Sequence, residues 1–381
     1  MKILLVGNYL PDAQESMQRF THMLEEGLRE KGYEVVVIRP QVYLGGIQWV
    51  VPNARKWLGY IDKYILFDSS LKEQVKLADL IHVIDHSNAI YNGYFRSKPS
   101  LLTCNDLLAI RSAFNEFPEN KIGLTGRLLQ HWILQGINQS QWVACISENT
   151  QRDLLRISQL PLEKTCVIHM GLNYNYQVIV EAKKLLSQVV DTNNCPFVLH
   201  VGGNQWYKNR MGVLSIFYRL TQQYPDLPIK LVMVGKPFTL SMNQYIFDKQ
   251  IQSRVVSLVS INNQQLEILY NCTEALLFPS RMEGFGWPII EAQACGCPVV
   301  CSSQEPLPEV AGDAALMASV EDEQALAQHL YTVLTKPELR QDLIRKGLQN
   351  VLRFRSEDMI NSYINLYQKV VEKFYDSPLA L

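Results

Sequence analysis

The feature that most constrains the fold is a repeated alternation of short apolar runs with longer amphipathic segments. Lys2–Val6 (KILLV) and Glu34–Ile38 (EVVVI) have the length and composition of strands, and the residues between them mix apolar and charged side chains up to Gly32. A strand, a helix and a second apolar strand open a parallel sheet, whose strands are buried on both faces. The alternation starts again at Phe197–Val201, so the sequence predicts an α/β chain with two doubly wound sheets.

The other strands and one long helix follow from the same pattern. Ser147 is a typical N-cap residue, and it directly follows an apolar run. The predicted strands are Leu80–Ile84, Leu101–Cys104, Trp142–Ile146 and Thr165–His169 in the first half and Ile229–Val234, Val255–Ser260 and Ala275–Phe278 in the second, and Thr125–Gln139 is a predicted helix.

The composition is that of a globular protein with room for two domains. Of its 381 residues, 47% are hydrophobic and 19% are charged. The formal net charge of -1 gives no general attraction for nucleic acid. Met1 and Lys2 lead directly into a strand, and no apolar run approaches the roughly 20 residues of a membrane span. We therefore expect a cytoplasmic protein that does not bind nucleic acid.

One loop of the second half has the residues of a ligand site. In Glu274–Cys301 (EALLFPSRMEGFGWPIIEAQACGCPVVC), Gly284 and Gly286 allow backbone N–H groups to approach a phosphate at the start of a helix. The carboxylates of Glu283 and Glu291 flank the same loop and can accept hydrogen bonds from sugar hydroxyls. A phosphate cradle between carboxylates suits a nucleotide-sugar. The alternative is that Glu291 stabilises its own helix start and Glu283 is an ordinary loop acid.

Three cysteines lie close together in this stretch. Cys295, Cys297 and Cys301 have the spacing C-x-C-x3-C, which is not a usual zinc pattern, and no histidine is near them in the sequence. They are better explained as small buried residues, so we predict no metal site.

The spacing Glu283-x7-Glu291, within EGFGWPIIEA and followed by ACGCPVV, resembles the signature of retaining glycosyltransferase family 4, the group 1 glycosyltransferases. Overall the chain is similar to cyanobacterial members that build extracellular polysaccharides. The resemblance implies the GT-B architecture, two facing Rossmann-like domains with a deep cleft between them. It implies an acceptor-binding domain at 1–172, a nucleotide-sugar-binding domain at 173–355, and a helix at 356–381 that crosses back to the first domain, with a loose tail from 376.

The resemblance also implies roles for the donor site. Glu283 would contact the transferred hexose, Glu291 the ribose, and Lys208, in VGGNQWYKNR, the diphosphate at the start of a helix. The family's second cation, an arginine, is replaced here by Gly203, so that Arg210 or Lys236 would have to supply the charge. The rest of the implied donor site is made of Gly235, Ile261, Gly284, Phe285 and Gly286.

In the first half, polar residues directly follow two of the predicted strands, and others lie in the first loop. Where the family has a histidine after one of these strands, this chain has Asn105, which cannot take up a proton. His86, after the neighbouring predicted strand, could fill this role, or it could be a structural histidine at a strand end. The first loop, GNYLPDAQES, lacks the paired glycines that family members often have. The expected acceptor-side residues are Asn8, Gln14, Ser16 and Asp106.

Between residues 43 and 64 lies a segment rich in aromatic and basic side chains. Trp57, Tyr60, Ile61 and Tyr64 fall on one face of a helix, with basic residues mostly elsewhere. Such a stripe usually packs into the core. It could instead rest on a membrane or grip the lipid phosphate of an acceptor.

The function implied by the resemblance is retaining transfer of a hexose, with UDP-glucose as the preferred donor, to a saccharide or lipid-linked saccharide in polysaccharide biosynthesis. No cofactor or metal is expected, since the chain has no Asp-x-Asp. Peripheral contact with the inner membrane face would suit a lipid-linked acceptor. The alternatives are a GDP-mannose-dependent mannosyltransferase, a nucleotide-sugar epimerase and a non-catalytic sugar-binding protein. The absence of G-x-G-x-x-G argues against an NAD-dependent dehydrogenase.

Overall fold

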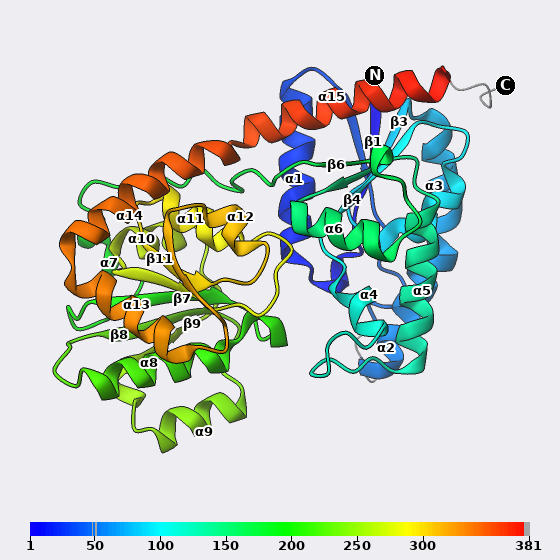
Figure 1. The fold of residues 1–381 in the computed structure, drawn as a ribbon. Helices are drawn as coiled ribbons and strands as arrows, with labels where there is room; N and C mark the ends of the chain where they lie inside the picture. The colour runs from blue at the N-terminus through cyan, green and yellow to red at the C-terminus, as the bar shows by residue number, and fades with distance from the viewer. Residues whose placement is uncertain (48, 50–51, 377–381) are drawn as a thin grey trace. The chain divides into compact units, whose positions relative to one another are not determined.

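The computed structural model describes residues 1–47, 49 and 52–376. The chain forms two compact units, and Figure 1 shows their helices and strands. Unit 1 contains Met1–Asn173 and the chain from Ser356 onward, and unit 2 contains Tyr174–Arg355. Each unit is built on one six-stranded parallel sheet, as the sequence predicts. Of the tail expected from 376, residues 377–381 lie outside the described part.

Unit 1 has the strand order β2-β1-β3-β4-β5-β6. Because β1 lies between β2 and β3, the chain leaves β1 toward one edge of the sheet and later continues from its other side. The loops after β1 and β3 therefore diverge at a topological switch point. The strands are β1 (Lys2–Val6), β2 (Glu34–Ile38), β3 (Leu80–Val83), β4 (Ser100–Cys104), β5 (Val143–Cys145) and β6 (Thr165–Val167).

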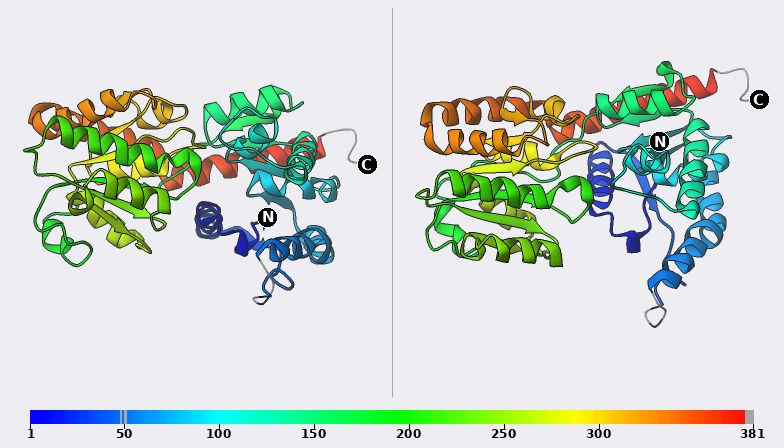
Figure 2. Two further views of the ribbon diagram at one scale, coloured as in Figure 1. Left: turned by 90° about the horizontal axis from the view of Figure 1, so that it is seen from below. Right: turned by 60° about the horizontal axis from the view of Figure 1, so that its bottom comes forward.

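Helices cover both faces of this sheet. On one face α3, η3 and α5 bury the apolar side chains of alternate strand residues. On the other face, His82 of β3 bonds to Tyr367 of the C-terminal helix α15 (2.8 Å) and to Thr103 (2.8 Å). Both views of Figure 2 show α15, in red, beside the cyan elements of this unit. Its helices are α1 (Glu15–Glu30), α2 (Pro52–Ile61), α3 (Phe67–Leu77), α4 (Leu108–Ala113), α5 (Leu124–Asn138), α6 (Glu148–Ile157) and α15 (Ser356–Tyr375), and its shorter turns are η1 (Leu10–Asp12), η2 (Asp62–Leu66), η3 (His86–Tyr94) and η4 (Leu162–Lys164).

Unit 2 has the strand order β12-β11-β10-β7-β8-β9. The chain starts at β7, adds β8 and β9 on one side, and then returns to add β10 to β12 on the other side. The switch point therefore lies between β7 and β10. The strands are β7 (Phe197–Gly202), β8 (Lys230–Gly235), β9 (Val255–Leu258), β10 (Ala275–Phe278), β11 (Val299–Ser302) and β12 (Ala315–Ala318).

The helices of unit 2 also lie on both faces of its sheet. Figure 1 shows α10 and α11 above β7 and β8 and shows α8 and α9 below them. One core joins α8, α9 and α13 to alternate residues of the strands, such as Leu231 and Leu277. The helices are α7 (Lys183–Leu186), α8 (Arg210–Gln223), α9 (Leu240–Asp248), α10 (Asn263–Cys272), α11 (Trp287–Ala294), α12 (Leu307–Ala311), α13 (Glu323–Thr335) and α14 (Pro337–Asn350), with the turns η5 (Trp206–Lys208), η6 (Gln252–Arg254) and η7 (Val351–Phe354).

Two local predictions have informative outcomes. Ser147 is confirmed as the N-cap of α6, since its hydroxyl accepts a hydrogen bond from the Thr150 N–H. Lys208 was expected at the start of a helix, but it ends the turn η5, and α8 begins at Arg210. The residue between them, Asn209, has φ of 52°, a left-handed conformation that breaks the helical path.

Candidate functional site

The switch point of unit 2 brings together two of the charged residues that are predicted from the sequence to bind a donor. Lys208 lies in the loop after β7, and Glu283 lies in the loop after β10. The Lys208 Nζ is 2.8 Å from Oε1 and 2.9 Å from Oε2 of Glu283, so the ammonium donates to both oxygens. The pair is largely buried, with exposed side-chain fractions of 18% and 7%. The position of each residue in a loop after a strand predicts that both face the site. It does not predict that Lys208 and Glu283 form an ion pair with each other.

Glycines shape the loops around this pair. Gly286 is the N-cap of α11 with φ of +113°, and a Cβ there would lie 3.0 Å from a Leu307 methyl group. Gly235, at the end of β8, has φ of +144°, and a Cβ there would lie 2.1 Å from the Gly202 carbonyl oxygen. Both positions therefore need glycine. In the first turn of α11, Pro288 has no N–H and the Ile289 N–H donates to the Gly286 carbonyl oxygen (3.0 Å), so the start of this helix can attract an anion mainly through its dipole.

Glu291 is buried within α11. Its Oε2 accepts a hydrogen bond of 2.9 Å from the hydroxyl of Tyr270, which is fully buried. Burial first, and Glu291 second, raise the pKa of Tyr270 well above its ordinary value, so this hydroxyl remains a donor. The carboxylate is therefore fixed in position before any ligand arrives. Its predicted contact with a ribose stays a prediction.

Arg210 is the better placed of the two residues that could replace the missing arginine. Its side chain is buried (4% exposed), and its Nη1 donates to the Asn204 side chain and, at 2.7 Å, to the Lys236 carbonyl oxygen. Its buried Nε and Nη2 have no hydrogen-bond partner among the described residues. Burial lowers the pKa of this guanidinium from its ordinary value. Lys236 is exposed, and its backbone carbonyl is the part that contacts Arg210.

The remaining predicted donor residues occupy the same edge of the sheet. Gly203 directly follows β7, and Ile261 follows β9; both are partly exposed. Gly284 and Phe285 lie between Glu283 and α11, and the buried Phe285 ring packs edge-on against Phe354 at 5.5 Å. The carboxyl ends of four neighbouring strands thus carry the predicted donor residues of unit 2.

In unit 1 the corresponding switch point is organised around Asp85, which the sequence predictions did not include as a site residue. Its carboxylate accepts hydrogen bonds from Asn8 (2.6 Å), Ser87 (2.6 Å) and Asn105 (3.3 Å), and its Oδ1 lies 3.0 Å from the His86 Nδ1. Asp85 directly follows β3, so its place at the carboxyl end of that strand was the available signal.

Burial and pairing act in opposite directions on this cluster. Burial would raise the pKa of Asp85, but the charge of His86 and the hydrogen bonds from Ser87 and Asn8 hold it well below its ordinary value. Burial would lower the pKa of His86, but Asp85 outweighs this and raises it. His86 therefore favours its protonated form beside the Asp85 carboxylate.

The residues predicted for the acceptor side differ in whether they lie in the Asp85 cluster. Gln14 joins the cluster, because its side-chain oxygen accepts a hydrogen bond from Asn8. Ser16 is exposed on α1 and lies outside the cluster. Asp106 is partly exposed and accepts a hydrogen bond from the Leu108 N–H (3.0 Å), and its charge contributes to the raised pKa of His86.

A pocket of about 440 Å³ opens beside this cluster. Its floor is held by the buried Asp62, which accepts hydrogen bonds from the Tyr9 hydroxyl (2.6 Å) and from the N–H groups of Leu44 and Gly45 (2.9 Å each). We call it the aromatic-basic pocket. Its lining is Asn8, Tyr9, Pro11, Asp12, Gln14, Gly45, Arg55, Lys56, Gly59, Tyr60, Lys63, Tyr64, Ser87, Asn88, Leu129, Gln130 and Ile133.

Two members of the predicted aromatic stripe, Tyr60 and Tyr64, line this pocket, and Tyr64 also packs against the core of unit 1. Trp57 is exposed, while Tyr60, Ile61 and Tyr64 are only partly buried. The Tyr60 and Tyr64 rings stack with centroids 5.6 Å apart. The Lys63 ammonium lies 4.9 Å from the Tyr60 ring centroid and 2.9 Å from an oxygen of Asp12. The expectation of a core stripe therefore holds only in part, because Tyr64 packs against the core whereas Trp57 is exposed.

The cysteines of the chain form neither disulfides nor a metal-binding group among the described residues. All eight cysteines are free, and the adjacent Cys295, Cys297 and Cys301 are buried. In the described ranges, no group of three or more His, Cys, Asp and Glu side chains could hold a metal ion.

None of the helices among the described residues is long and apolar enough to cross a membrane.

Comparisons with known proteins agree with this arrangement. The model of "Glycosyltransferase Family 4" matches residues 17–176, and that of "Glycosyl transferases group 1" matches residues 183–350. The chain is 24% identical over 292 residues to the O-antigen chain mannosyltransferase B of Escherichia coli, which covers 74% of this chain and 75% of that relative.

Two solved structures show the same fold. Sucrose-phosphate synthase (tll1590) from Thermosynechococcus elongatus is similar with a TM-score of 0.77 and 18% identity, over 98% of this chain and 100% of that one. Anabaena Alr3699/HepE in complex with UDP and glucose is similar with a TM-score of 0.73 and 16% identity, over 99% of this chain and 100% of that one.

Proposed function

Because this chain belongs to the group 1 glycosyltransferases of family 4 and has their two-domain GT-B fold, we propose that it moves a hexose from a nucleotide-sugar to a saccharide or lipid-linked saccharide, with retention of the anomeric configuration. The enzyme is a glycosyltransferase of polysaccharide or lipopolysaccharide-type biosynthesis. The observation that carries the proposal is the pairing of Lys208 with Glu283 beside the glycine loop that opens α11.

In this proposal unit 2 holds the donor. The diphosphate lies against the start of α11, with Lys208 as one cation and Arg210 as the other. The unpartnered Nε and Nη2 atoms of Arg210 support the assignment, because a buried donor without an acceptor costs about 1–3 kcal/mol that an anionic ligand would recover. These positive groups stabilise the leaving diphosphate without a metal ion.

Glu283 has two successive roles in this proposal, one before and one after the donor binds. Before the donor binds, it neutralises Lys208. When the diphosphate of the donor forms an ion pair with the Lys208 ammonium, the Glu283 carboxylate becomes available to accept hydrogen bonds from hydroxyls of the hexose. It then orients the sugar. Glu291 accepts from the ribose while Tyr270 holds it in place.

Unit 1 holds the acceptor in this proposal, at the Asp85 cluster and the aromatic-basic pocket. His86 already pairs with the Asp85 carboxylate at 3.0 Å, and this pairing raises its pKa, so we assign its imidazole to orienting the acceptor rather than to taking its proton. Asn105 cannot accept this proton. The acceptor oxygen forms its bond to the anomeric carbon as the bond to the diphosphate breaks, and the leaving phosphate oxygen takes the proton. His86 and Asn105 orient the acceptor.

For the donor we propose UDP-glucose, supported by the similar Anabaena structure with UDP and glucose. The alternative is GDP-mannose, supported by the O-antigen mannosyltransferase relative. The aromatic wall beside Lys56 and Lys63 supports a lipid-linked acceptor, because such a surface suits a phosphate at a membrane interface. We therefore propose a cytoplasmic enzyme with peripheral contact at the inner membrane face.

Calorimetry on the purified protein with a chelator tests the donor. UDP, GDP, ADP and the glucose and mannose conjugates of these nucleotides are titrated in turn, and hydrolysis of each conjugate that binds is then followed. Binding of one base without metal, with slow release of its nucleoside diphosphate, supports the proposal. An epimerase would instead interconvert the sugar, and a sugar-binding protein would leave it intact. Failure of all the nucleotides to bind would show the proposal to be wrong.

A further inference from the structure

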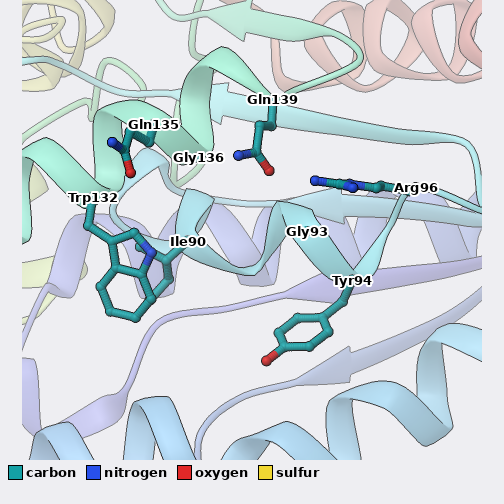
Figure 3. Close-up of a pocket in the computed structure, with 8 residues that line it drawn as sticks. All are labelled: Ile90, Gly93, Tyr94, Arg96, Trp132, Gln135, Gly136 and Gln139. Carbon is teal, nitrogen blue, oxygen red and sulfur yellow. The ribbon is translucent and has the colours of Figure 1, made fainter.

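A second pocket of unit 1, of about 460 Å³, lies on another side of α5 and takes no part in the proposed reaction. Figure 3 shows it between α5 and η3. Trp132 and Tyr94 lie on one side of the space, the amides of Gln135 and Gln139 lie on the other, and Arg96 extends toward Gln139. We call it the α5–η3 pocket.

The spacing of the α5 residues explains why they share one face. Trp132, Gln135 and Gln139 are separated by three and four positions, which places them in one row along a helix. Gly136, in the same row, has no side chain, and a Cβ there would lie 2.3 Å from the Ala89 carbonyl oxygen. The glycine lets η3 approach the helix closely and form the floor of the pocket.

The walls are held in place from outside the pocket. The buried Asn92 of η3 donates to the Gly136 carbonyl oxygen (2.9 Å) and to the Ser140 hydroxyl (2.7 Å), which fixes η3 against α5. The Tyr94 hydroxyl bonds to Asp68, and the Lys72 ammonium lies 5.0 Å from the Tyr94 ring. A preformed site loses little conformational entropy when a ligand binds.

The polar groups of this pocket are available to a ligand. The side chains of Gln135, Gln139 and Arg96 have no hydrogen-bond or ion-pair partner in the part of the chain that the structure describes. Two amides offer both donors and acceptors, and the guanidinium offers donors. The Trp132 side chain is 45% exposed and Tyr94 is 37% exposed, so both rings have an open side.

Exposed aromatic rings opposite free amides suit a molecule with an apolar face and a rim of hydroxyls, which describes a pyranose. Resting on the proposed function, we propose that the α5–η3 pocket is a second saccharide-binding site for sugar residues of the acceptor remote from the transfer point. The volume of about 460 Å³ lies within the range of small-molecule sites.

The pocket is also connected to the proposed acceptor region. Tyr64 lines the aromatic-basic pocket, Trp132 lines the α5–η3 pocket, and their rings meet edge-on with centroids 5.2 Å apart. The two pockets are therefore joined by a direct contact between an aromatic ring of each. This continuity favours distal residues of one acceptor over an unrelated small molecule.

Saturation-transfer NMR with the full chain tests the site, using maltohexaose and an α-linked mannohexaose as probes. We expect one of them to bind, and Trp132→Ala to weaken that binding about tenfold through loss of ring stacking. Phe247→Ala removes an exposed aromatic side chain of unit 2, outside both pockets, and should leave binding unchanged. Gly93→Trp should also block binding, because nothing lies within 4 Å of a Cβ at this lining residue. Gly123→Trp, equally unobstructed but outside the pocket, is its matched control.

The outcomes separate this site from the proposed function. Binding of neither hexasaccharide, or binding that Trp132→Ala and Gly93→Trp leave intact, overturns the saccharide site. Nucleotide binding is measured by calorimetry in the same preparations, and the variants should not change it, because the predicted donor residues belong to unit 2. If the wild-type protein itself did not bind any of the nucleotides, the proposed function would be overturned instead.

Discussion

The two units place their ligand-facing loops by the same rule but fill them with different chemistry. In each unit the first strand lies at the switch point, beside β3 in unit 1 and beside β10 in unit 2. Across the switch point of unit 1, the neutral Asn8 donates to Asp85. Across that of unit 2, the cation Lys208 pairs with Glu283. Topology therefore fixes where a site lies, and a few loop residues decide which charge it can receive.

The difference suits the two proposed ligands. Unit 2 has a cation, Lys208, that can turn from the Glu283 carboxylate to a diphosphate. Unit 1 has a buried carboxylate satisfied by neutral donors and His86, which suits a partner rich in hydroxyls. Its cations Arg55, Lys56 and Lys63 line the aromatic-basic pocket and form no ion pair with Asp85 among the described residues.

The largest test of this comparison separates the two members of the unit 2 pair. Lys208→Ala should weaken UDP or GDP binding about tenfold or more, because a charge-assisted contact to the diphosphate is lost. Glu283→Gln should strengthen binding of the free nucleoside diphosphate, since Lys208 no longer has a competing carboxylate, yet it should reduce transfer about a hundredfold or more. Calorimetry and a nucleotide-release assay measure the two effects.

Glu321→Gln is the control for this pair, because its carboxylate contacts Arg281 at the exposed surface and not Lys208. Glu283→Ala should abolish transfer with an unchanged circular dichroism spectrum. Near-normal turnover by Glu283→Ala would contradict the assignment of Glu283. Equal losses of diphosphate affinity in Lys208→Ala and Glu283→Gln would show that the two residues do not compete.

The second test breaks the network of unit 1. Asp85→Asn should lower the free energy of unfolding by about 2–3 kcal/mol, because it leaves a buried His86 without its charged partner. It should also lower the pKa of His86, which Asp85 raises in the wild type. Denaturant unfolding and NMR titration of the imidazole measure these changes. Asp106→Asn, partly exposed, should cost much less, and an equal cost for both variants would contradict a special role for Asp85.

How much of this could be predicted from the sequence depends on the range of the interaction. Strands such as β1, β2 and β10 were predicted with their observed bounds, since apolar runs and turn residues are local signals. The pairing of Lys208 with Glu283 joins residues 75 positions apart, and no local pattern contains it. Asp85 was missed as a hub for the same reason, because its donors come from three separate loops. The aromatic stripe is only partly core, since Tyr64 packs against the core while Trp57 is exposed, and apolar periodicity alone does not separate these two environments.

The third test compares the units through two buried histidines. Burial lowers the pKa of both His82 in unit 1 and His200 in unit 2 to about 3. The unfolded chain, with an ordinary pKa of about 6.5, then binds more protons than the folded one between these values. The stability that each neutral imidazole contributes is thus present above about pH 6.5 and falls toward about pH 3, by up to roughly 1.4 kcal/mol per pH unit for each histidine.

Hydrogen exchange as a function of pH can assign this loss to one unit at a time. His200→Gln should flatten the acid dependence of opening in β7, β8 and β10, and His82→Gln should do so in β1, β3 and β4. Variants of the exposed His22 should change neither profile. An unchanged acid slope in both variants would mean that other groups control acid unfolding.

The smallest expected effect concerns the cation that unit 1 keeps outside its switch point. Lys63→Ala removes an ammonium held between Asp12 and the Tyr60 ring, so an anionic group in the aromatic-basic pocket would lose one partly exposed contact. We expect the KM for a phosphate-bearing acceptor to rise about three- to tenfold with kcat nearly unchanged, because the contact is equally strong in the ground and transition states. Lys76→Ala, on α3 and outside the pocket, is the matched control. If Lys63→Ala instead lowered kcat without changing KM, the cation would act on the reacting atoms, and the contrast between a cation at the switch point of unit 2 and neutral Asn8 at that of unit 1 would be wrong.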